Sequence, residues 1–465
     1  MHHRMSRFLF FCFCIFGVSA CEKATEVPLL NLPDAVEFAW LKSVGGVNDE
    51  VIRGTFVDAQ SNTNIAGTFR GTMSAGGQSL TSNGFLDFFL AKLDRNGNFL
   101  WQKSFGSSVG SDLAVDVDGD ASGNIYVTGM FSKNINLGNG VLLNADTSDD
   151  DVFIAKFDAT GTCLWAKMGI GNATDYGNEI NLTPDNKVLT IGFANRGITF
   201  DNTTFSNATN YGMFVSKHNS NGVLEWVKLF SATGEVSGRG ISSDANGNAL
   251  ITGTFKGTLT LGTTSLTATS ANGDVFVAKL DANGNTIWAK TFGQTGENYA
   301  RGIDSDSEGN IYVSGVYATQ ITLGSISLAS NGQKDIFLAK FDTSGNAIWA
   351  KTIGSTDNDE GCEIEVNTNG DIFLTGSYTS TITLNDENFV AKGLRDVFVA
   401  KMDKNGSFLW QKTMGSSQDD ENYAIGLNRT NENLVTVGTF AGTFTQGSQS
   451  LISLGSYDSY ISFLK

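Results

Sequence analysis

Apolar and polar residues alternate with a period of two along most of the chain, and short polar turns interrupt the alternation. The stretch from residue 297 to 353 is the clearest example. It predicts four strands, at residues 297–306, 311–317, 335–341 and 346–353. Such alternation between turn-forming residues is typical of β-strands rather than helices. The Thr-, Ser- and Leu-rich stretch at residues 318–332 is long enough to add a small hairpin between the second and third strands.

The third strand of this unit is apolar on both faces. Its sequence, DIFLAK from Asp335, recurs as DVFVAK from Asp274, DVFIAK from Asp151 and DVFVAK from Asp396. A strand that is buried on both faces has this composition. We therefore expect each sheet to be covered on both sides by neighbouring sheets.

The unit recurs along the chain, and each copy carries one tryptophan. The seven tryptophans are 61 to 64 residues apart, and a lysine follows each of them two positions later. They are Trp40, Trp101, Trp165, Trp226, Trp288, Trp349 and Trp410. A fixed period of this length indicates a repeat architecture. If Ala278 pairs with Trp288 in the last hairpin, each ring lies over a small residue and fills the gap toward the next unit, as a structural staple rather than a ligand contact.

Four antiparallel strands per unit, covered by neighbouring units, predict a β-propeller. The chain ends at residues 458–465 with a third strand that lacks a fourth, and residues 35–42 supply a fourth strand that lacks a third. The N-terminal strand should therefore complete the last blade, which leaves no open sheet edge. The expected fold is all-β, a seven-bladed propeller of four-stranded antiparallel blades over residues 35–465.

This topology also predicts two different faces. The two short turns of each blade, and both ends of the propeller, belong on one face. The long connections belong on the other face, and we expect ligand or partner recognition there, because binding residues favour loops on a rigid scaffold.

Residues 1–20 have the pattern of an export signal, with a basic start and a short apolar run. That run is too short to span a membrane as a helix. The sequence Val-Ser-Ala-Cys ending at Cys21 resembles the lipobox of bacterial lipoproteins. This resemblance implies cleavage before Cys21, lipid attachment there, and a tether at residues 21–34 that anchors the propeller in the bacterial cell envelope, at the outer membrane in particular. The alternative is an ordinary secretory signal with a chance cysteine.

Charge and cysteine content narrow the choice of partners. The formal net charge is -17, which argues against nucleic acid and anionic lipid as partners. A protein or a glycan remains possible, and we expect a monomer. After the leader only Cys163 and Cys362 remain. We interpret both as small buried residues rather than as a disulfide.

The sequence does not suggest a catalytic set. His218 is the one histidine after the leader, and it is interpreted as a variant of the turn residue that is Asp281 in another repeat. Without a second histidine, neither a Ser-His-Asp triad nor a multi-histidine metal site can be built. Catalysis by carboxylates stays open, because Asp and Glu are abundant.

Two segments echo the start of a calcium loop. They are Asp304-x-Asp306-x-Glu308 and Asp116-x-Asp118-x-Asp120. In the first, Gly315 replaces the glutamate required at the twelfth position of such a loop. We interpret these acids as turn-capping side chains, and no cofactor is expected, although calcium remains possible.

Each blade places an acidic residue just before its first strand. These residues are Asp49, Asp112, Asp175, Glu235, Glu297, Glu360 and Glu421. One interpretation is structural, in which each carboxylate accepts backbone N–H bonds and fixes the loop between blades. The other is an acidic collar at the mouth of the central channel, which would hold cations or a basic partner.

Two family resemblances bear on the function. The segment GNIYVSG from Gly309 to Gly315, with residues 335–340, resembles the seven-bladed β-propeller (SBBP) repeat over about residues 36–465. This resemblance implies the fold and a bacterial envelope setting, but no defined activity. Residues 278–288 are similar to the tryptophan-docking hairpin of quinoprotein (PQQ) propellers and of outer-membrane assembly lipoproteins. Here the turn is one residue shorter and seven blades replace the usual eight.

Three functions follow from these observations. The first, which the lack of a catalytic set favours, is a lipid-anchored binding or scaffold protein without enzymatic activity. The second is a carboxylate-dependent hydrolase or lyase that acts on glycans. A cluster of unlike polar residues that breaks the repeat, drawn from the divergent segments 55–67 and 176–197, would favour it. The third is an assembly factor like the PQQ-type propeller lipoproteins.

Overall fold

The computed structural model describes residues 36–145, 149–171, 173–206 and 212–465. The chain divides into two units, Met1–Val36 and Glu37–Lys465. The expected signal, Cys21 and the tether lie outside the described residues. No helix within the described ranges has the length and apolar character needed to cross a membrane.

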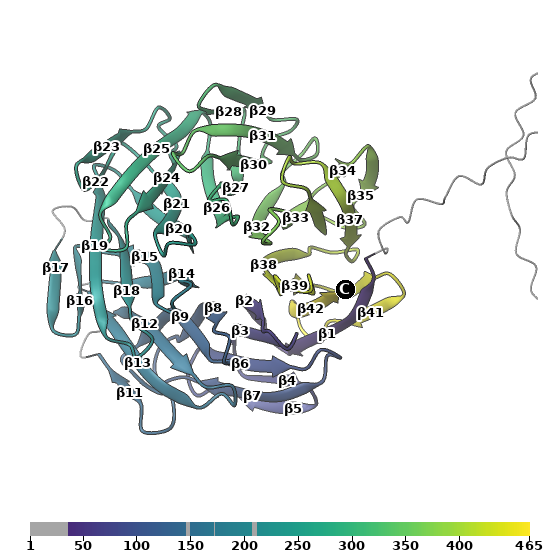
Figure 1. The fold of residues 1–465 in the computed structure, drawn as a ribbon. Coiled ribbons are helices and arrows are strands. Elements are labelled where there is room, and N and C mark those ends of the chain that lie inside the picture. Colours follow the sequence, from purple (N-terminus) through teal and green to yellow (C-terminus); the bar gives the residue numbers. More distant parts are fainter. Residues whose placement is uncertain (1–35, 146–148, 172, 207–211) are drawn as a thin grey trace, which may run out of the picture. The chain divides into compact units, whose positions relative to one another are not determined.

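Residues 37–465 form a ring of seven blades around a central channel (Figure 1). Blades 1 to 3 are β2 (Val51–Val57), β3 (Thr63–Phe69), β6 (Asp87–Leu93) and β7 (Phe99–Phe105); β8 (Leu113–Gly119), β9 (Ile125–Ser132), β12 (Asp150–Phe157) and β13 (Cys163–Ile170); and β14 (Tyr176–Leu182), β15 (Val188–Ala194), β18 (Gly212–His218) and β19 (Leu224–Ala232). Blades 4 and 5 are β20 (Val236–Ser243), β21 (Ala249–Phe255), β24 (Asp274–Leu280) and β25 (Thr286–Thr295); and β26 (Asn298–Ser305), β27 (Ile311–Tyr317), β30 (Asp335–Phe341) and β31 (Ala347–Ile353). Blades 6 and 7 are β32 (Glu360–Val366), β33 (Ile372–Tyr378), β36 (Asp396–Met402) and β37 (Phe408–Met414); and β38 (Glu421–Leu427), β39 (Leu434–Phe440), β42 (Asp458–Leu464) and β1 (Phe38–Gly46).

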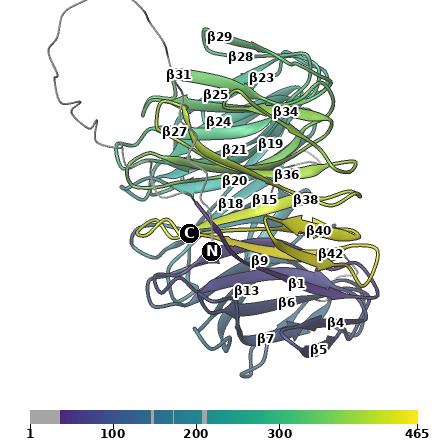
Figure 2. The ribbon, with the colours of Figure 1, turned by 90° about the vertical axis from the view of Figure 1, so that its right-hand side faces the viewer.

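The ring closes as the two incomplete ends of the repeat predicted. Strand β1 pairs antiparallel with β42, and Trp40 lies opposite Phe463 and Lys42 opposite Ile461. Glu37 and Lys465 exchange two backbone hydrogen bonds of 3.0 and 3.1 Å at the end of this ladder. Both ends of the propeller therefore lie side by side (Figure 2). The predicted all-β, seven-bladed fold is confirmed.

The stretch between the second and third strands forms the expected hairpin in every blade. The hairpins are β4 (Thr72–Ala75) and β5 (Gln78–Thr81); β10 (Asn134–Asn136) and β11 (Leu142–Asn144); β16 (Gly197–Phe200) and β17 (Thr203–Ser206); β22 (Thr258–Leu261) and β23 (Thr264–Thr267); β28 (Gln320–Leu323) and β29 (Ile326–Ala329); β34 (Thr381–Leu384) and β35 (Glu387–Val390); and β40 (Thr443–Gln446) and β41 (Gln449–Ile452). Four of them continue the sheet of the preceding blade, where β4 pairs with β1, β16 with β13, β22 with β19 and β28 with β25. These hairpins therefore join adjacent blades by backbone hydrogen bonds.

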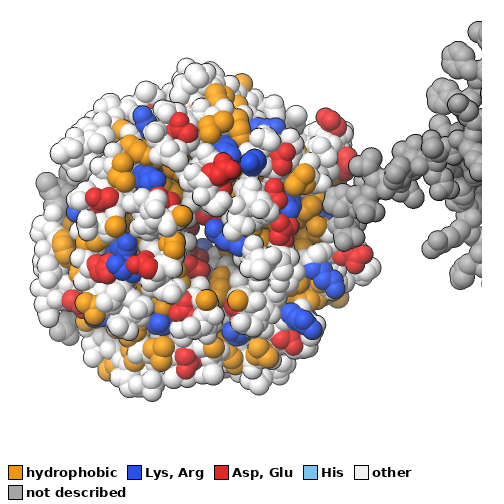
Figure 3. All heavy atoms as spheres, in the orientation of Figure 1, with side chains coloured by type: hydrophobic (Ala, Val, Ile, Leu, Met, Phe, Trp, Pro, Cys, Tyr) orange, Lys and Arg blue, Asp and Glu red, His pale blue; other side chains and the backbone are white. Residues whose placement is uncertain are grey.

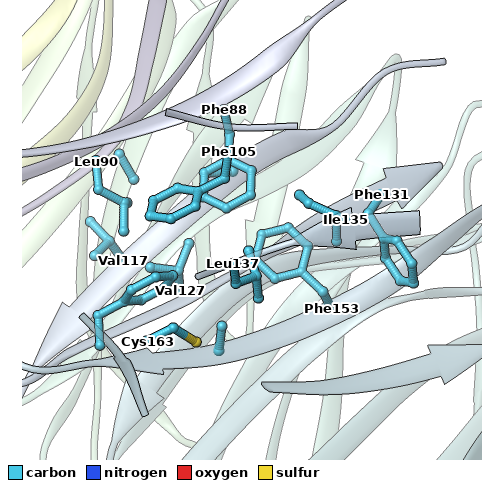
Figure 4. Close-up of a cluster of buried hydrophobic side chains, with 14 of the residues drawn as sticks. Phe88, Leu90, Phe105, Val117, Val127, Phe131, Ile135, Leu137, Phe153 and Cys163 are labelled. Atoms are coloured by element: carbon cyan, nitrogen blue, oxygen red, sulfur yellow. The ribbon is translucent and has the colours of Figure 1, made fainter. Parts of the chain in front are cut away.

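The hydrophobic core lies between blades rather than inside one. Buried residues of the described chain form clusters, and each cluster draws on two adjacent blades. Between blades 1 and 2, for example, the ring of Phe88 lies 5.2 Å from that of Phe105 and 5.1 Å from that of Phe153 (Figure 4). Cys163 belongs to the same cluster as a buried free thiol. This arrangement explains why the third strands are apolar on both faces.

The predicted pairing of Ala278 with Trp288 is wrong by one residue. Trp288 lies opposite Lys279, and Ala278 lies opposite Ala289, because the ladder shifts between Lys279 and Leu280. The indole reaches the next blade instead of a neighbour in its own hairpin.

The contact of Trp288 is with the last turn of the next blade. Its Nε1 donates a hydrogen bond of 3.1 Å to the carbonyl of Thr343, and a Cβ built on Gly345 would lie 2.8 Å from its ring. Equivalent hydrogen bonds join Trp40 to Arg95, Trp101 to Ala159, Trp165 to Ser220, Trp226 to Ala282 and Trp349 to Lys404. Trp410 belongs to the blade before the closure, where the two chain ends replace that turn.

His218 is not the turn residue that the sequence suggested. It is the last residue of β18, fully buried, and it lies opposite Val188. Asn219 takes the turn position, and its side-chain oxygen accepts backbone N–H bonds from Asn221 and Val223, each of 3.0 Å. Burial lowers the pKa of His218 to about 4, so its imidazole is neutral at physiological pH.

Candidate functional site

The acidic residues expected to form a collar do not form one ring. Asp112 and Asp175 are fully buried, whereas Asp49, Glu235 and Glu297 are exposed. The carboxylate of Asp112 accepts backbone N–H bonds from Ser107 (2.6 Å) and Ser132 (3.0 Å). At three other seams the adjacent residue, rather than the predicted one, is the buried acid. These buried acids are Glu50, Asp359 and Asp420.

Four of the other collar residues have cationic partners close by. Glu235 and Glu297 form ion pairs of 2.8 Å with Lys256 and Lys334 respectively. Both Glu360 and Glu421 contact Arg395. A cavity of about 480 Å³ on the long-loop side is lined by Glu235, Glu297, Glu360, Lys256 and Lys334 among others. The cavity on this face is therefore lined by both acidic and basic side chains rather than by a ring of carboxylates.

Five seams between blades hold two buried carboxyl groups each. One comes from the start of a third strand and the other from the loop before the next first strand. The pairs are Asp87 with Asp112, Asp151 with Asp175, Asp335 with Asp359, Asp396 with Asp420, and Asp458 with Glu50. Burial raises the pKa to about 6 for Asp112, about 7 for Asp359 and Asp420, and about 8 for Asp175 and Glu50. Hydrogen bonds from the backbone oppose this rise without cancelling it, so Asp175 and Glu50 stay largely protonated at neutral pH, whereas Asp112 is largely protonated only below about pH 6.

The central channel is a cavity with a volume of about 720 Å³. The seven first strands line it, together with residues of the short turns that follow them, such as Ala59, Pro184 and Thr368. It therefore opens on the short-turn face, at the opposite end from the loops where the sequence analysis expected recognition. Acidic and basic side chains surround the central hollow of the ring (Figure 3).

The first strand of every blade contains a β-bulge, and the bulged residue lines the channel or occupies the same register position. These positions hold Arg53, Val115, Asn178, Arg239, Arg301, Cys362 and Tyr423. Bulges re-aim side chains and are over-represented next to active sites. We call Arg53, Arg239 and Arg301, from blades 1, 4 and 5, the arginine level.

Two further positions of the first strands bring carboxyl groups to the channel. The residue after the bulge gives Asp116, Glu179 and Glu363, which we call the first carboxyl level. The residue two positions further gives Asp118, Asp304 and Glu365, the second carboxyl level. The other blades have small or neutral residues at these positions. The channel wall therefore breaks the sevenfold repeat that the strands behind it obey.

Several of these carboxyl groups hold the edge of the neighbouring first strand. Asp116 accepts the backbone N–H of Ile180 at 2.9 Å, and Glu179 accepts that of Ile241 at 3.1 Å. In the second level, Asp118 accepts the N–H of Leu182 and Asp304 that of Val366, both at 2.8 Å. These N–H groups lie on the innermost strands, where no further strand can pair with them.

The surrounding protein shifts the pKa of the channel carboxyl groups upward. Desolvation raises the pKa of Asp116 and Glu179 well above the usual range, and the charge of Glu363 adds to both shifts. The pKa of Glu363 is also raised by desolvation, although Arg301 and Arg239 oppose the shift. Desolvation raises the pKa of Asp118 to about 6. Carboxyl groups with raised pKa in an accessible cavity can act as hydrogen-bond donors or general acids near neutral pH.

Arg429 narrows the channel from the side of blade 7. It comes from the turn after β38, which is one residue longer than the turn between Asp58 and Asn62 in blade 1. Its guanidinium lies 2.7 Å from Asp304 and 2.9 Å from Glu365. The second carboxyl level is thus partly neutralised by a residue from another blade.

The acids that echoed a calcium loop do not converge on one point. Asp306 caps its own turn by accepting N–H bonds from Glu308 and Asn310, whereas Asp304 is buried and accepts hydrogen bonds from Ser242 and Arg429. Glu308 contacts Lys404 at 3.6 Å. Across the ranges that the structure describes, no group of three or more His, Cys, Asp or Glu residues is placed to hold a metal ion.

The channel residues were missed by the sequence analysis because they do not recur. Asp116 and Asp118 were noted only as part of a calcium-loop pattern, and Glu179, Glu363 and Arg239 were not singled out at all. One signal was available in the sequence. Aligning the repeats on their turns shows that charged residues replace small ones at two fixed positions of the first strand.

The comparisons with known proteins are consistent with a repeat protein but assign neither a family nor an activity. No family model matches the chain. It is 23% identical to an uncharacterized WD repeat-containing protein of Acanthamoeba polyphaga mimivirus, across 96% of this chain and 40% of that protein. It is 25% identical to the regulatory protein FlaEY of Caulobacter vibrioides, across 43% of this chain and 21% of that protein. The chain thus spans less than half the length of either relative.

Solved structures with a related arrangement are distant. A protein of unknown function from Dyadobacter fermentans has a TM-score of 0.43 at 8% identity, over 91% of this chain and 99% of that one. The calcium-binding protein regucalcin from Agrobacterium tumefaciens has a TM-score of 0.32 at 12% identity, over 70% of this chain and 81% of that one. A gluconolactonase from Xanthomonas campestris has a TM-score of 0.35 at 10% identity, over 71% and 84%. Similarity this low does not transfer an activity.

Proposed function

We propose that this protein is a lipid-anchored binding protein of the bacterial cell envelope, and that it takes a small polar ligand, free or as part of a glycan or protein partner, into the central channel. The observation that carries the proposal is the contrast between the channel wall and the rest of the repeat. Positions that serve only the ring recur from blade to blade, whereas the channel wall carries different charged residues in different blades.

The size and lining of the channel suit a polar ligand of modest size. A volume of about 720 Å³ lies within the roughly 300–1,000 Å³ typical of small-molecule sites. The lining combines guanidinium groups, carboxyl groups and the ring of Tyr423. The smaller cavity at Glu235, Glu297 and Lys334 is the competing place, because it lies on the long-loop face where the sequence first suggested recognition.

A screen of glycan and peptide arrays with the full chain in detergent tests the proposal. The ligand it finds should lose binding when Glu363→Gln is introduced in the channel. It should be unaffected by Glu297→Gln, which changes the same kind of group at the smaller cavity. The opposite pattern would move recognition to the long-loop face, and the absence of any channel-dependent ligand would refute the proposal.

The proposed anchoring is supported by the lipobox-like sequence before Cys21 and is tested separately. Cells fed a labelled fatty acid should incorporate the label into the wild-type chain but not into Cys21→Ser. Fractionation should then find the wild-type protein in the outer membrane and the variant in the soluble fraction. Equal labelling of both chains would leave a binding protein without the proposed anchor.

The first carboxyl level supports a second candidate, a carboxylate-dependent hydrolase or lyase for glycans. Asp116, Glu179 and Glu363 share one cavity, and their pKa values are raised. Glycoside hydrolysis uses one protonated and one ionised carboxyl group. If a glycan from the array is cleaved by the wild type and only bound by Glu179→Gln or Glu363→Gln, the enzyme assignment replaces the binding one.

A further inference from the structure

The arginine level is placed where the two cavities meet. Arg239 and Arg301 line both the channel and the smaller cavity on the long-loop side, and Arg53 lines the channel. All three occupy the bulged position of a first strand, in blades 1, 4 and 5. Arg239 and Arg301, from adjacent blades, therefore bring two positive charges to the place where the cavities meet, and Arg53 adds a third to the channel lining.

These guanidinium groups differ from those of Arg395 and Arg429 in their partners. Arg395 and Arg429 each contact two or more carboxylates at short distance. Within the described part of the chain, Arg53, Arg239 and Arg301 form no ion pair with a carboxylate inside 4.0 Å. The Nε atoms of Arg53 and Arg301 are in addition buried without a hydrogen-bond partner.

Aromatic rings hold two of these side chains in position. The guanidinium carbon of Arg53 lies 5.6 Å from the ring centre of Tyr423, and that of Arg301 lies 5.6 Å from the ring centre of Tyr299. Such cation–π contacts fix the plane of a guanidinium but leave its N–H donors unused. An unpaired donor in a partly desolvated site is costly unless something accepts its hydrogen bonds.

The charges around the arginine level also favour the binding of an anion. Desolvation and the nearby charge of Arg301 lower the pKa of Arg239, which shows that like charges repel one another here. The first carboxyl level cannot fully compensate, because the raised pKa of Asp116, Glu179 and Glu363 favours their neutral forms. The arginine level is therefore positive although the whole chain carries a formal charge of -17.

We propose that Arg239 and Arg301 bind an oxyanion, either a carboxylate or a phosphate, on a small polar ligand inside the central channel that Arg53 also lines. This inference rests on the proposed binding function and names the chemical class of the ligand. The planar guanidinium fork matches two oxygens of a carboxylate or phosphate at once, which a neutral hydroxyl ligand does not offer. The adjacent neutral carboxyl groups would donate hydrogen bonds to the hydroxyl groups of the same ligand.

Calorimetric titration of the full chain in detergent tests the inference with three probes. A trimer of galacturonic acid represents the carboxylate source, inorganic phosphate represents the phosphate source, and a neutral galactose trimer is the matched control. We expect one of the oxyanion probes to bind, and the neutral trimer to bind at least about tenfold more weakly.

The variant Arg239→Gln/Arg301→Gln should lower the affinity for the oxyanion probe by about tenfold or more. The matched control is Arg70→Gln, because Arg70 is exposed outside the channel and packs over Phe85. It removes a single charge of the same kind and should leave binding unchanged. Thermal melting shows whether the double variant is folded, and Arg239→Lys/Arg301→Lys should restore part of the affinity.

The outcomes separate this inference from the function on which it rests. If the neutral trimer binds as tightly as the acidic one, or if the double glutamine variant binds either oxyanion probe normally, the oxyanion site is refuted while a channel ligand remains. If neither oxyanion probe binds but an array ligand depends on Glu363, the proposed function stands and the inference fails. If no array ligand depends on the channel, the proposed function fails as well.

Discussion

The seams between blades and the wall of the channel are built from the same repeats but follow different rules. At the seams, a tryptophan of one blade donates to the last turn of the next blade, and this contact recurs at six positions. At the channel wall, the bulged residue is arginine in three blades and a different residue in each of the other four. Both regions come from strands at fixed places in the blade, so the difference does not reflect backbone geometry.

In a repeat protein, residues that bind a ligand are best sought at positions that differ between the copies. A position that holds the ring together faces the same environment in every blade, so each copy needs the same residue. A position that faces the channel is free of that requirement. Charged residues confined to some copies, such as Glu179 and Glu363, are therefore better candidates for ligand contact than residues found in all of them.

The largest effect is expected at the closing seam. Trp40 is 7% exposed, and its ring stacks on Phe463 with a centroid distance of 5.1 Å. Trp40→Ala should lower the free energy of unfolding by about 3–5 kcal/mol, as measured by urea denaturation. Trp349→Ala, whose indole is more exposed, is the matched variant and should cost clearly less. If both variants lose the same free energy of unfolding, Trp40 contributes no more to ring closure than Trp349 contributes to its own seam.

Buried carboxyl pairs should make the seams sensitive to pH. The folded-state pKa of Asp359 is raised to about 7 by burial, so the folded chain holds a proton that the unfolded chain releases near pH 4. The stability from this group is present at low pH and is lost as pH rises through about 7. Asp359→Asn should therefore match the wild type at about pH 3, where the carboxyl group is protonated in both states, and exceed its unfolding free energy by about 2–4 kcal/mol at pH 9.

Asp281→Asn is the control for this measurement. Although partial burial acts the other way, hydrogen bonds from Asn285 and Asn283 lower the pKa of Asp281. Its contribution to stability is therefore present above the unfolded pKa, and the variant should be no more stable than the wild type at pH 9. If Asp359→Asn behaves like Asp281→Asn, the seam carboxyl groups are ionised in the folded state.

Channel variants should change binding and leave the ring intact. Glu363→Gln replaces a carboxyl group of raised pKa by a neutral group of the same shape. Its free energy of unfolding at pH 7 should stay within about 1 kcal/mol of the wild type, while the affinity for a channel ligand changes. Urea denaturation and calorimetric titration of the same samples measure both. A loss of stability like that of Trp40→Ala would show that the channel wall also holds the ring.

The smallest effect is expected at the outer strands. Ile287 lies next to Trp288 but is 53% exposed, so Ile287→Thr should change the free energy of unfolding by no more than about 0.5 kcal/mol. Ile336, which is fully buried at a seam, is the matched position, and Ile336→Ala should cost about 2–5 kcal/mol. A large loss at Ile287 would indicate that something covers this surface in solution.

Much of the fold could be predicted because the sequence pattern that produces each blade repeats along the chain. The 61- to 64-residue spacing of the tryptophans and the incomplete units at both ends sufficed to predict seven blades and their closure. The errors were errors of register. His218 was placed one residue too far along, on the turn that Asn219 occupies. Trp288 was paired with Ala278 rather than with Lys279, because the shift in the ladder after Lys279 leaves no mark in the alternation of polar and apolar residues.

The candidate site was less accessible to prediction because it is assembled from distant blades. Asp116 and Glu363 are about 250 residues apart in the sequence, yet their charges interact in the channel. No local spacing links them, and the acids that did recur, such as Glu235 and Asp112, proved to have different environments. The acids that recur in the sequence are thus the ones that fix loops or form ion pairs with lysines, rather than the ones that line the channel.

The sequence by itself determined the number of blades, the order of strands and the closure, because each of these follows from a pattern repeated within one stretch of chain. Only the tertiary structure decided which side chains share the channel, since that depends on bringing seven first strands to one axis. It also decided the protonation of the buried acids, because the pKa of a group such as Asp359 follows from the desolvation and neighbouring charge that packing creates.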